Sequence, residues 1–264
     1  MSSSTESTPT TLCVLGVKLH AVSMEQAVER VLALAHRPGF HLVVTLGTEM
    51  VMRAQNDPEF RELVNGADLV VADGAGLLWA ARRCGLSLPE RVAGIDLVCR
   101  LAETLAGSNG SFFLLGAAPG VAEEAARTLC NRYPGLRIAG SQDGFFQEDG
   151  PVVQAVAASG ARVLLTGLGS PRQERWMRQH QDRLGVGVGI GVGGSFDVLS
   201  GRKTRAPGWM IRLHLEWLFR LACEPSRLLR MMALPRFMGR VLGSRGQAVT
   251  LWNDPGRPGP PASP

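Results

Sequence analysis

Cysteine is scarce in this sequence, and long uncharged apolar runs are missing from it. The five cysteines form no CxxC pair, so their spacing predicts neither a disulfide framework nor a zinc site built from sequence neighbours. No uncharged apolar run reaches the roughly 18–20 residues that cross a bilayer. The polar start, MSSSTESTPT, lacks the basic and then apolar pattern of a signal peptide. We therefore expect a cytoplasmic protein.

Acidic residues are nearly missing from one late segment of the chain. Residues 201–245 hold ten Lys and Arg but only two acids, Glu216 and Glu224, whereas the rest of the chain holds 18 basic and 21 acidic residues. The formal net charge of +5 therefore arises from one region, which needs an explanation of its own.

This basic segment is also rich in large apolar side chains. They recur at steps of three and four residues, which is typical of an amphipathic helix, at Trp209, Met210, Leu213, Trp217 and Leu221. Beyond them, Pro225 and Pro235 divide the chain into short helical pieces. Arginines interleaved with apolar residues favour an interfacial helix on anionic lipid. The alternative is a C-terminal helix packed on the core with a solvated basic face. The segment is too apolar to favour nucleic acid as a partner.

Before this segment, short apolar runs alternate with helical patterns. Strands are expected at 12–17, 40–46, 67–73, 111–117, 136–141, 161–169 and 186–193. Among the intervening helices, one has Ser23 as a plausible N-cap and another has the Asp57-Pro58 pair at its start. Continuous apolar strands separated by helices predict an α/β fold, with a mainly parallel sheet covered by helices on both faces.

Several polar or glycine positions fall where these expected strands end. In a parallel sheet, ligands bind where the carboxyl ends of the strands meet, so we expect Thr45, Asp73, Gly116, Gly169 and Gly193 to converge. Asp73 stands in VVADGAG, where Asp-Gly is also a common turn signal. The alternative to a plain turn is a carboxylate that acts as a general base.

Three further stretches carry candidate chemistry. RVAGIDL places Arg91 and Asp96 before a helix, and GLGSPRQERW predicts a helix N-terminus suited to an anion. Gln173 and Glu174 lie in its first turn, where capping is the simpler role. The third stretch, GIGVGGSFDVLSG, matches G-x-G-x-x-G, but we expect a loop after it until about Pro207. The dinucleotide fingerprint needs a helix there, so we discount a nicotinamide enzyme.

Together, seven ordered motifs resemble the WecG/TagA/CpsF family of bacterial glycosyltransferases over roughly residues 11–240. The motifs are TLGTEMV, ADLVVADGAGLLWAARRCG, ERVAGIDLV, LLGAAPGVAEEAA, GLGSPRQERW, GVGGSFDVLSGRKTRAP and LEWLFRLACEPSRLLR. The resemblance implies a Rossmann-like core that works with no cofactor and no metal ion. It implies transfer of an N-acetylhexosamine-type sugar, N-acetylmannosamine or its uronic acid, from a UDP-sugar donor. The acceptor it implies is an undecaprenyl-diphosphate-linked sugar, and the product belongs to a cell-surface polysaccharide or teichoic-acid-type polymer.

The resemblance also assigns functional positions. Asp73 matches the aspartate proposed as the catalytic base. The substrate-binding candidates are Thr45, Gly47, Arg91, Asp96, Gln173, Gly193, Gly194, Arg220, Arg227 and Arg230. Of these, Arg220, Arg227 and Arg230 match arginines of a C-terminal basic appendage that are proposed to contact the diphosphate of UDP or of the lipid-linked acceptor. Asp96 is equally a candidate to cap the helix that follows it. Gly47 departs from the family pattern, because many members have an asparagine there, and this puts the identity of the sugar in question.

The resemblance completes the expected organisation. We expect a disordered tail at 1–10, an α/β catalytic domain at 11–205, a basic amphipathic helical appendage at 206–245 and a disordered tail at 246–264. The appendage is expected to hold the enzyme peripherally at the inner face of the cell membrane through residues 206–240, and a homo-oligomer is a further expected assembly. The rival interpretations are another nucleotide-sugar-binding enzyme with a merely structural appendage, and a non-catalytic membrane-surface adaptor of the same fold.

Overall fold

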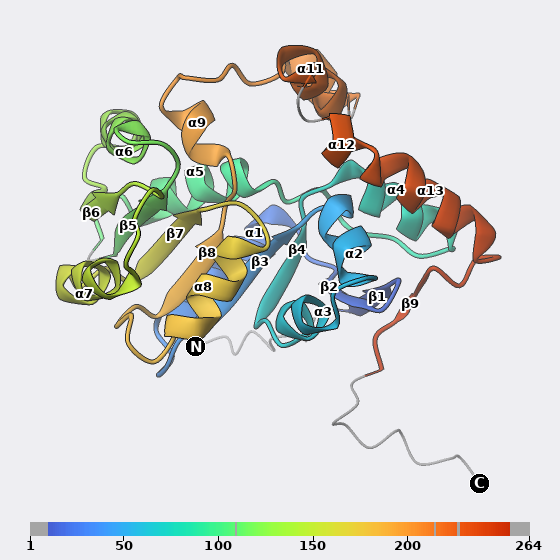
Figure 1. Ribbon diagram of the computed structural model, residues 1–264, viewed down its shortest axis with the longest axis horizontal. Helices are drawn as coiled ribbons and strands as arrows, with labels where there is room; N and C mark the ends of the chain where they lie inside the picture. Colours follow the sequence, from blue (N-terminus) through green and yellow to red (C-terminus); the bar gives the residue numbers. More distant parts are fainter. Residues whose placement is uncertain (1–9, 109, 214, 226–227, 254–264) are drawn as a thin grey trace, which may run out of the picture.

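The computed structural model describes residues 10–108, 110–213, 215–225 and 228–253, and it contains a six-stranded parallel sheet (Figure 1). The order of the strands is β4-β3-β8-β7-β5-β6. Their bounds are β3 (His41–Leu46), β4 (Leu69–Ala72), β5 (Ser111–Gly116), β6 (Arg137–Gln142), β7 (Val163–Gly167) and β8 (Val188–Gly191). Each lies within or beside an apolar run that predicts it, so the expected parallel α/β sheet is confirmed.

Helices cover both faces of this sheet. One face packs against α1 (Met24–Ala35), α5 (Gly94–Leu105), α6 (Val121–Arg132) and α9 (Ser195–Leu199). The other packs against α2 (Thr48–Ala54), α3 (Pro58–Asn65), α4 (Ala75–Arg83), α7 (Asp149–Ser159) and α8 (Arg172–His180). The two predicted helix starts are confirmed. Ser23 accepts the Gln26 N–H in a capping box, and Asp57 accepts the Phe60 N–H ahead of Pro58.

The apolar run at 12–17 does not form a strand of the main sheet, contrary to our expectation. β1 (Thr11–Val14) and β2 (Val17–His20) form an antiparallel hairpin, because Leu15 and Gly16 turn the chain with φ of 48° and 82°. The hairpin covers the edge strand β4, where the Val70 N–H donates to His20 Nδ1 at 2.9 Å. Burial lowers the pKa of His20 to about 4, so this nitrogen keeps its lone pair near neutral pH.

The end of the described chain also differs from expectation. Residues 246–264 were expected to be a disordered tail, but β9 (Val249–Leu251) pairs antiparallel with β1. Val249 is buried, so this short strand completes the three-stranded order β2-β1-β9. Its partner lies at the opposite end of the sequence, which no local pattern reveals. The rest of the two expected tails, residues 1–9 and 254–264, lies outside the described residues.

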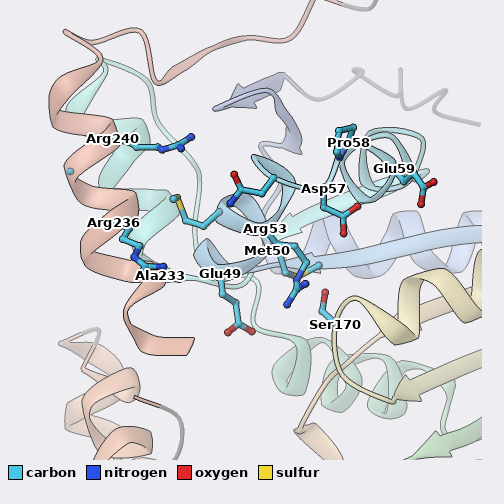
Figure 2. Close-up of a pocket in the computed structure, with 13 residues that line it drawn as sticks. Glu49, Met50, Arg53, Asp57, Pro58, Glu59, Ser170, Ala233, Arg236 and Arg240 are labelled. Atoms are coloured by element: carbon cyan, nitrogen blue, oxygen red, sulfur yellow. The ribbon is translucent and has the colours of Figure 1, made fainter. Parts of the chain in front are cut away.

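The basic segment contains α10 (Gly208–Arg212), α11 (Glu216–Cys223), α12 (Leu228–Met231) and α13 (Ala233–Gly243). The single amphipathic helix expected through residues 209–221 is wrong, because α10 ends at Arg212 and α11 begins only at Glu216. Pro235 does not divide a helix but lies in the first turn of α13, where it removes no helical hydrogen bond. α13 packs against α2 and α4, and Figure 2 shows it facing α2 and α3. Within the described residues, every helix is too short or too polar to cross a membrane.

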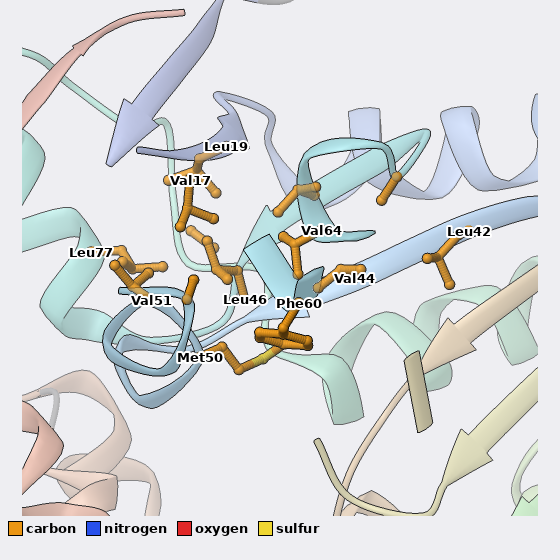
Figure 3. Close-up of a cluster of buried hydrophobic side chains, with 14 of the residues drawn as sticks. Val17, Leu19, Leu42, Val44, Leu46, Met50, Val51, Phe60, Val64 and Leu77 are labelled. Carbon is orange, nitrogen blue, oxygen red and sulfur yellow. The ribbon is translucent and has the colours of Figure 1, made fainter. Parts of the chain in front are cut away.

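Alternating side chains of β3 reach the two separate cores. Leu42, Val44 and Leu46 enter the core beneath α2, α3 and α8, whereas Val43 enters the core beneath α1 and α5 (Figure 3). The first of these cores also contains Phe237 of α13. The appendage is therefore built partly into the core of the domain.

The buried position of Phe237 gives a prediction about stability. Phe237 is fully buried, so Phe237→Ala should lower the free energy of unfolding by about 3–5 kcal/mol through lost burial and a residual cavity. Leu242→Ala on the same helix is the matched control, because Leu242 is 55% exposed and should cost under about 0.5 kcal/mol. Denaturant titration measures both. Equal, small losses would mean that α13 does not dock on the core.

Candidate functional site

A small cavity of about 170 Å³ lies at the carboxyl ends of the central strands. Seven of the sequence-predicted candidates line it, namely Thr45, Gly47, Asp73, Arg91, Gln173, Gly193 and Gly194. All but Arg91 come from segments that end or follow β3, β4, β7 and β8, as expected for a parallel sheet, whereas Arg91 lies in the connection between α4 and α5. The fold therefore brings together residues up to 149 positions apart in sequence, from Thr45 to Gly194.

Asp73 lies in the short connection between β4 and α4. Its N–H donates to the Leu46 carbonyl at 2.9 Å, which fixes the connection to the end of β3. The glycine at 76 is required because a Cβ there would lie 2.7 Å from Thr48 Cγ2, where α4 meets α2. The Asp73 side chain is 36% exposed, so its carboxylate is accessible from the cavity. VVADGAG is thus a turn that also presents a carboxylate.

Arg91 joins Asp73 to an acid from the appendage. Its Nη2 donates to Asp73 Oδ1 at 3.3 Å and to Glu216 Oε2 at 2.8 Å, and its Nε donates to the Asp73 carbonyl. The side chains of Arg91 and Glu216 are only 16% and 7% exposed. Burial opposes the charged form of Arg91, but the two carboxylates outweigh it and raise the pKa of the guanidinium. A carboxylate–guanidinium–carboxylate chain therefore runs from the cavity to the start of α11.

Gln173 is a nearly buried residue of the cavity lining. It is 3% exposed; its Nε2 donates to Glu174 Oε1 at 2.7 Å, and its Oε1 accepts the Gly193 N–H at 3.2 Å. Burial raises the pKa of the Glu174 carboxyl, which favours its neutral form. Gly191 permits this packing, because a Cβ there would lie 2.4 Å from Gln173 Nε2. Both side chains of the first turn are thus engaged in hydrogen bonds within the fold.

Thr45 and Gly47 also line the cavity. The Thr45 hydroxyl donates to the Gly191 carbonyl at 2.7 Å, which ties the ends of β3 and β8 together. Gly47 is the N-cap of α2, and a Cβ there would meet only Glu49 Cγ, at 3.9 Å. A side chain at position 47 would therefore have room, so the glycine leaves open space here.

The N-termini of three longer helices, α4, α5 and α8, lie at this edge of the sheet. They begin beside the cavity, at Gly74, Ala93 and Pro171, and in none of them does the side chain of the N-cap residue bond a first-turn N–H. The helix dipoles give this edge a positive potential. The arrangement suits a ligand that carries phosphate groups.

Other predicted residues lie elsewhere or cannot be placed. Asp96 does not line the cavity; its Oδ2 accepts from Arg205 Nη2 at 2.6 Å, and this hydrogen bond raises the pKa of Arg205. Arg220 and Arg230 belong to α11 and α12, but their side chains lie outside the described part of the structure, as does the whole of Arg227. Their assignment to a diphosphate stays a prediction.

The helix α9 corrects one expectation. Residues 195–199 were expected to be a loop, but α9 begins directly after Gly194. With five residues, α9 is shorter than the helix of a dinucleotide-binding unit. The glycines Gly193 and Gly194 line the small cavity instead.

Glu216 is the site residue that sequence reasoning missed. The sequence did contain a signal, because Glu216 and Glu224 are the two acids in a segment with ten basic residues. Both prove to anchor that segment. Glu216 pairs with Arg91, and Glu224 pairs with Lys203, which also pairs with Asp197 in α9.

The chain matches the model of the glycosyl transferase family WecG/TagA/CpsF over residues 12–249. It belongs to that family. Three relatives are named N-acetylglucosaminyldiphosphoundecaprenol N-acetyl-beta-D-mannosaminyltransferase. The protein of Bacillus spizizenii W23 is 34% identical over 76% of this chain and 78% of its own length. That of Bacillus subtilis 168 is 31% identical over 81% and 84%, and that of Staphylococcus aureus NCTC 8325 is 32% identical over 86% and 91%. As a member of the WecG/TagA/CpsF family, the chain is a glycosyltransferase with an α/β fold.

Proposed function

We propose that this glycosyltransferase moves an N-acetylhexosamine, N-acetylmannosamine or its uronic acid, from a UDP donor to an undecaprenyl-diphosphate-linked sugar. The names of the relatives favour N-acetylmannosamine as the sugar and an N-acetylglucosaminyl diphosphoundecaprenol as the acceptor. The observation that carries the proposal is the small cavity, in which Thr45, Asp73, Arg91 and Gln173 converge beside three uncapped helix N-termini. An adaptor protein needs no such convergence.

In the proposed reaction, Asp73 is the general base. Its carboxylate takes the proton of an acceptor hydroxyl as that oxygen attacks the anomeric carbon of the donor sugar. The new bond joins the acceptor oxygen to that carbon, and the bond from the carbon to the β-phosphate oxygen breaks. The electron pair leaves with UDP. The Arg91 guanidinium donates hydrogen bonds to both the main-chain carbonyl and the side-chain carboxylate of Asp73, so the carboxylate keeps a fixed direction.

The departing UDP gains negative charge, which the protein must stabilise. The helix N-termini at Gly74, Ala93 and Pro171 supply oriented N–H groups without any metal ion. The appendage arginines Arg220, Arg227 and Arg230 are proposed to add cationic charge. This division of tasks is the basis for proposing metal-independent transfer.

The appendage is also proposed to hold the enzyme at the inner leaflet. Its large apolar side chains are exposed at Trp209, Leu213, Trp217 and Leu218, which suits insertion among lipid headgroups. Exposed apolar residues beside a basic segment fit an anionic surface.

The proposal is tested by UDP release from purified protein with a short-chain acceptor mimic and a panel of UDP-N-acetylhexosamines, with EDTA present. We expect acceptor-dependent release from UDP-N-acetylmannosamine, and no release above background when the mimic is left out. Release that EDTA abolishes would contradict metal independence. Release from another donor would reassign the sugar, and Gly47→Asn would then show whether position 47 sets that choice.

A further inference from the structure

A second, wider cavity of about 1170 Å³ lies between α13 and the helices α2 and α3 (Figure 2). It shares three lining residues with the small cavity, Glu49, Met50 and Ser170, so the two adjoin. Ligand sites commonly measure about 300–1,000 Å³. The small cavity, at about 170 Å³, is below that range and accommodates little more than the reacting sugar. The remainder of the substrates must lie outside it, and the wide cavity is the adjoining space.

The walls of the wide cavity carry arginines from both sides. Figure 2 shows Arg53 projecting from α2 and Arg236 from α13, with Arg240 one turn further along α13. Arg240 Nη1 donates to Gln55 Oε1 at 3.1 Å. Within the described residues, Arg53 and Arg236 form no ion pair and no hydrogen bond through their side chains. Two such cations facing one space favour an anionic ligand.

The acids of the wide cavity do not cancel this charge. Asp57 is already paired, because Arg175 Nη2 donates to its Oδ2 at 2.7 Å. Glu59 lies at the end of the cavity away from α13, and Glu49 lies on the border with the small cavity. A carboxylate on that border is placed to accept hydrogen bonds from the hydroxyl groups of a sugar. Arg53 and Arg236 then remain to bind phosphate.

We infer that the wide cavity binds the diphosphate of the lipid-linked acceptor between Arg53 and Arg236. This inference rests on the proposed function. A lipid-linked sugar has its diphosphate between the sugar and the lipid. In the protein, the small cavity adjoins the wide cavity, whose α13 wall belongs to a region with exposed apolar side chains at Leu228, Met232, Met238 and Leu242. The UDP donor carries no lipid that could contact this exposed apolar region, whereas the acceptor does. The acceptor is therefore the better match for the wide cavity.

The test uses full-length protein with Arg53→Gln, Arg236→Gln and the double variant. Arg127→Gln on α6 is the matched control, because Arg127 is an exposed arginine on a helix that packs on the opposite face of the sheet. Calorimetry measures three probes: a short-chain prenyl-diphosphate sugar, UDP and inorganic pyrophosphate. Steady-state assays measure the KM for the mimic and for the donor.

Each single variant should raise the Kd and KM for the acceptor mimic about tenfold, and the double variant should raise them further. The Kd of UDP should stay within about twofold of wild type. If wild type binds pyrophosphate and the double variant does not, the diphosphate alone is recognised. Binding of the mimic without pyrophosphate binding, and with the same losses, would assign recognition to the intact lipid-linked group.

Two results would overturn the inference. Weaker UDP binding with unchanged mimic binding would assign the wide cavity to the donor, and unchanged binding of all three probes would exclude a diphosphate there. A failure of the proposed function would give a different result from a failure of this inference. If wild type shows no turnover with any donor, but mimic binding depends on Arg53 and Arg236, the acceptor site stands and the transfer reaction is wrong.

Discussion

Replacement of Asp73 by asparagine should lower kcat by about 10²–10⁴-fold while the protein stays folded. The amide keeps the size of the side chain but cannot take a proton from the acceptor hydroxyl, and loss of a positioned base typically costs this much. The fold should tolerate the change because the side chain is 36% exposed and its main-chain bond to Leu46 remains. UDP release under saturating donor and acceptor measures the effect.

Donor binding separates loss of the base from loss of the site. The Kd of UDP for Asp73→Asn should equal that of wild type, because the asparagine removes no group that contacts the proposed diphosphate position. Asp182→Asn is the matched control, since Asp182 is an exposed aspartate beyond the far end of α8. Wild-type turnover by a correctly folded Asp73→Asn protein would exclude Asp73 as the base.

The sequence predicts the fold and the small cavity well because both depend on local patterns. Most strands of the main sheet are short apolar runs. Thr45 lies near the end of one of them, and Asp73 and Gly193 come just after two others. Once the sheet is known to be parallel, the convergence of these residues follows from geometry. Helix starts at Ser23 and Asp57 are likewise local, because the side chain caps an N–H only three residues away.

The features that could not be predicted depend on partners distant in sequence. The 12–17 run resembles a single strand, and only pairing with β9 and contact with β4 show why it folds back as a hairpin. Glu216 meets Arg91 across 125 positions of sequence, and no spacing rule indicates that pairing. The wide cavity needs α13 placed against α2, which buries Phe237. Such long-range contacts are set by packing of the whole chain.

These contacts also change how the appendage must be tested. Deleting everything after residue 205 would seem to separate a functional appendage from a structural one. The deletion would also remove Phe237 and Val241 from the core and β9 from its sheet. Such a protein is expected to be destabilised by several kcal/mol, so its inactivity would say nothing about chemistry. A single residue that links the appendage to the cavity is the better probe.

Glu216→Gln should therefore lower kcat by about tenfold to a hundredfold with little change in the KM for the donor. Glutamine keeps the shape of the side chain but removes the charge that, together with Asp73, holds the Arg91 guanidinium. Arg91 then loses one of its two carboxylates, and the direction of the Asp73 carboxylate is less well fixed. The matched control is Glu224→Gln, which breaks a partly exposed pair with Lys203 in the same segment and should leave kcat within about twofold of wild type.

A double-mutant cycle decides whether Glu216 acts through Arg91 or merely supports the fold. If Glu216 positions Arg91, then Arg91→Ala and the double variant Arg91→Ala with Glu216→Gln should have nearly the same kcat, because the second change removes nothing further. The coupling free energy should be about 1.4–2.8 kcal/mol, the equivalent of the tenfold to hundredfold loss. Additive losses would instead mean that Glu216 acts on turnover independently of Arg91. Coupling would mean that docking of the appendage sets the geometry of the proposed base, so that the cavity is complete only when α11 is in place.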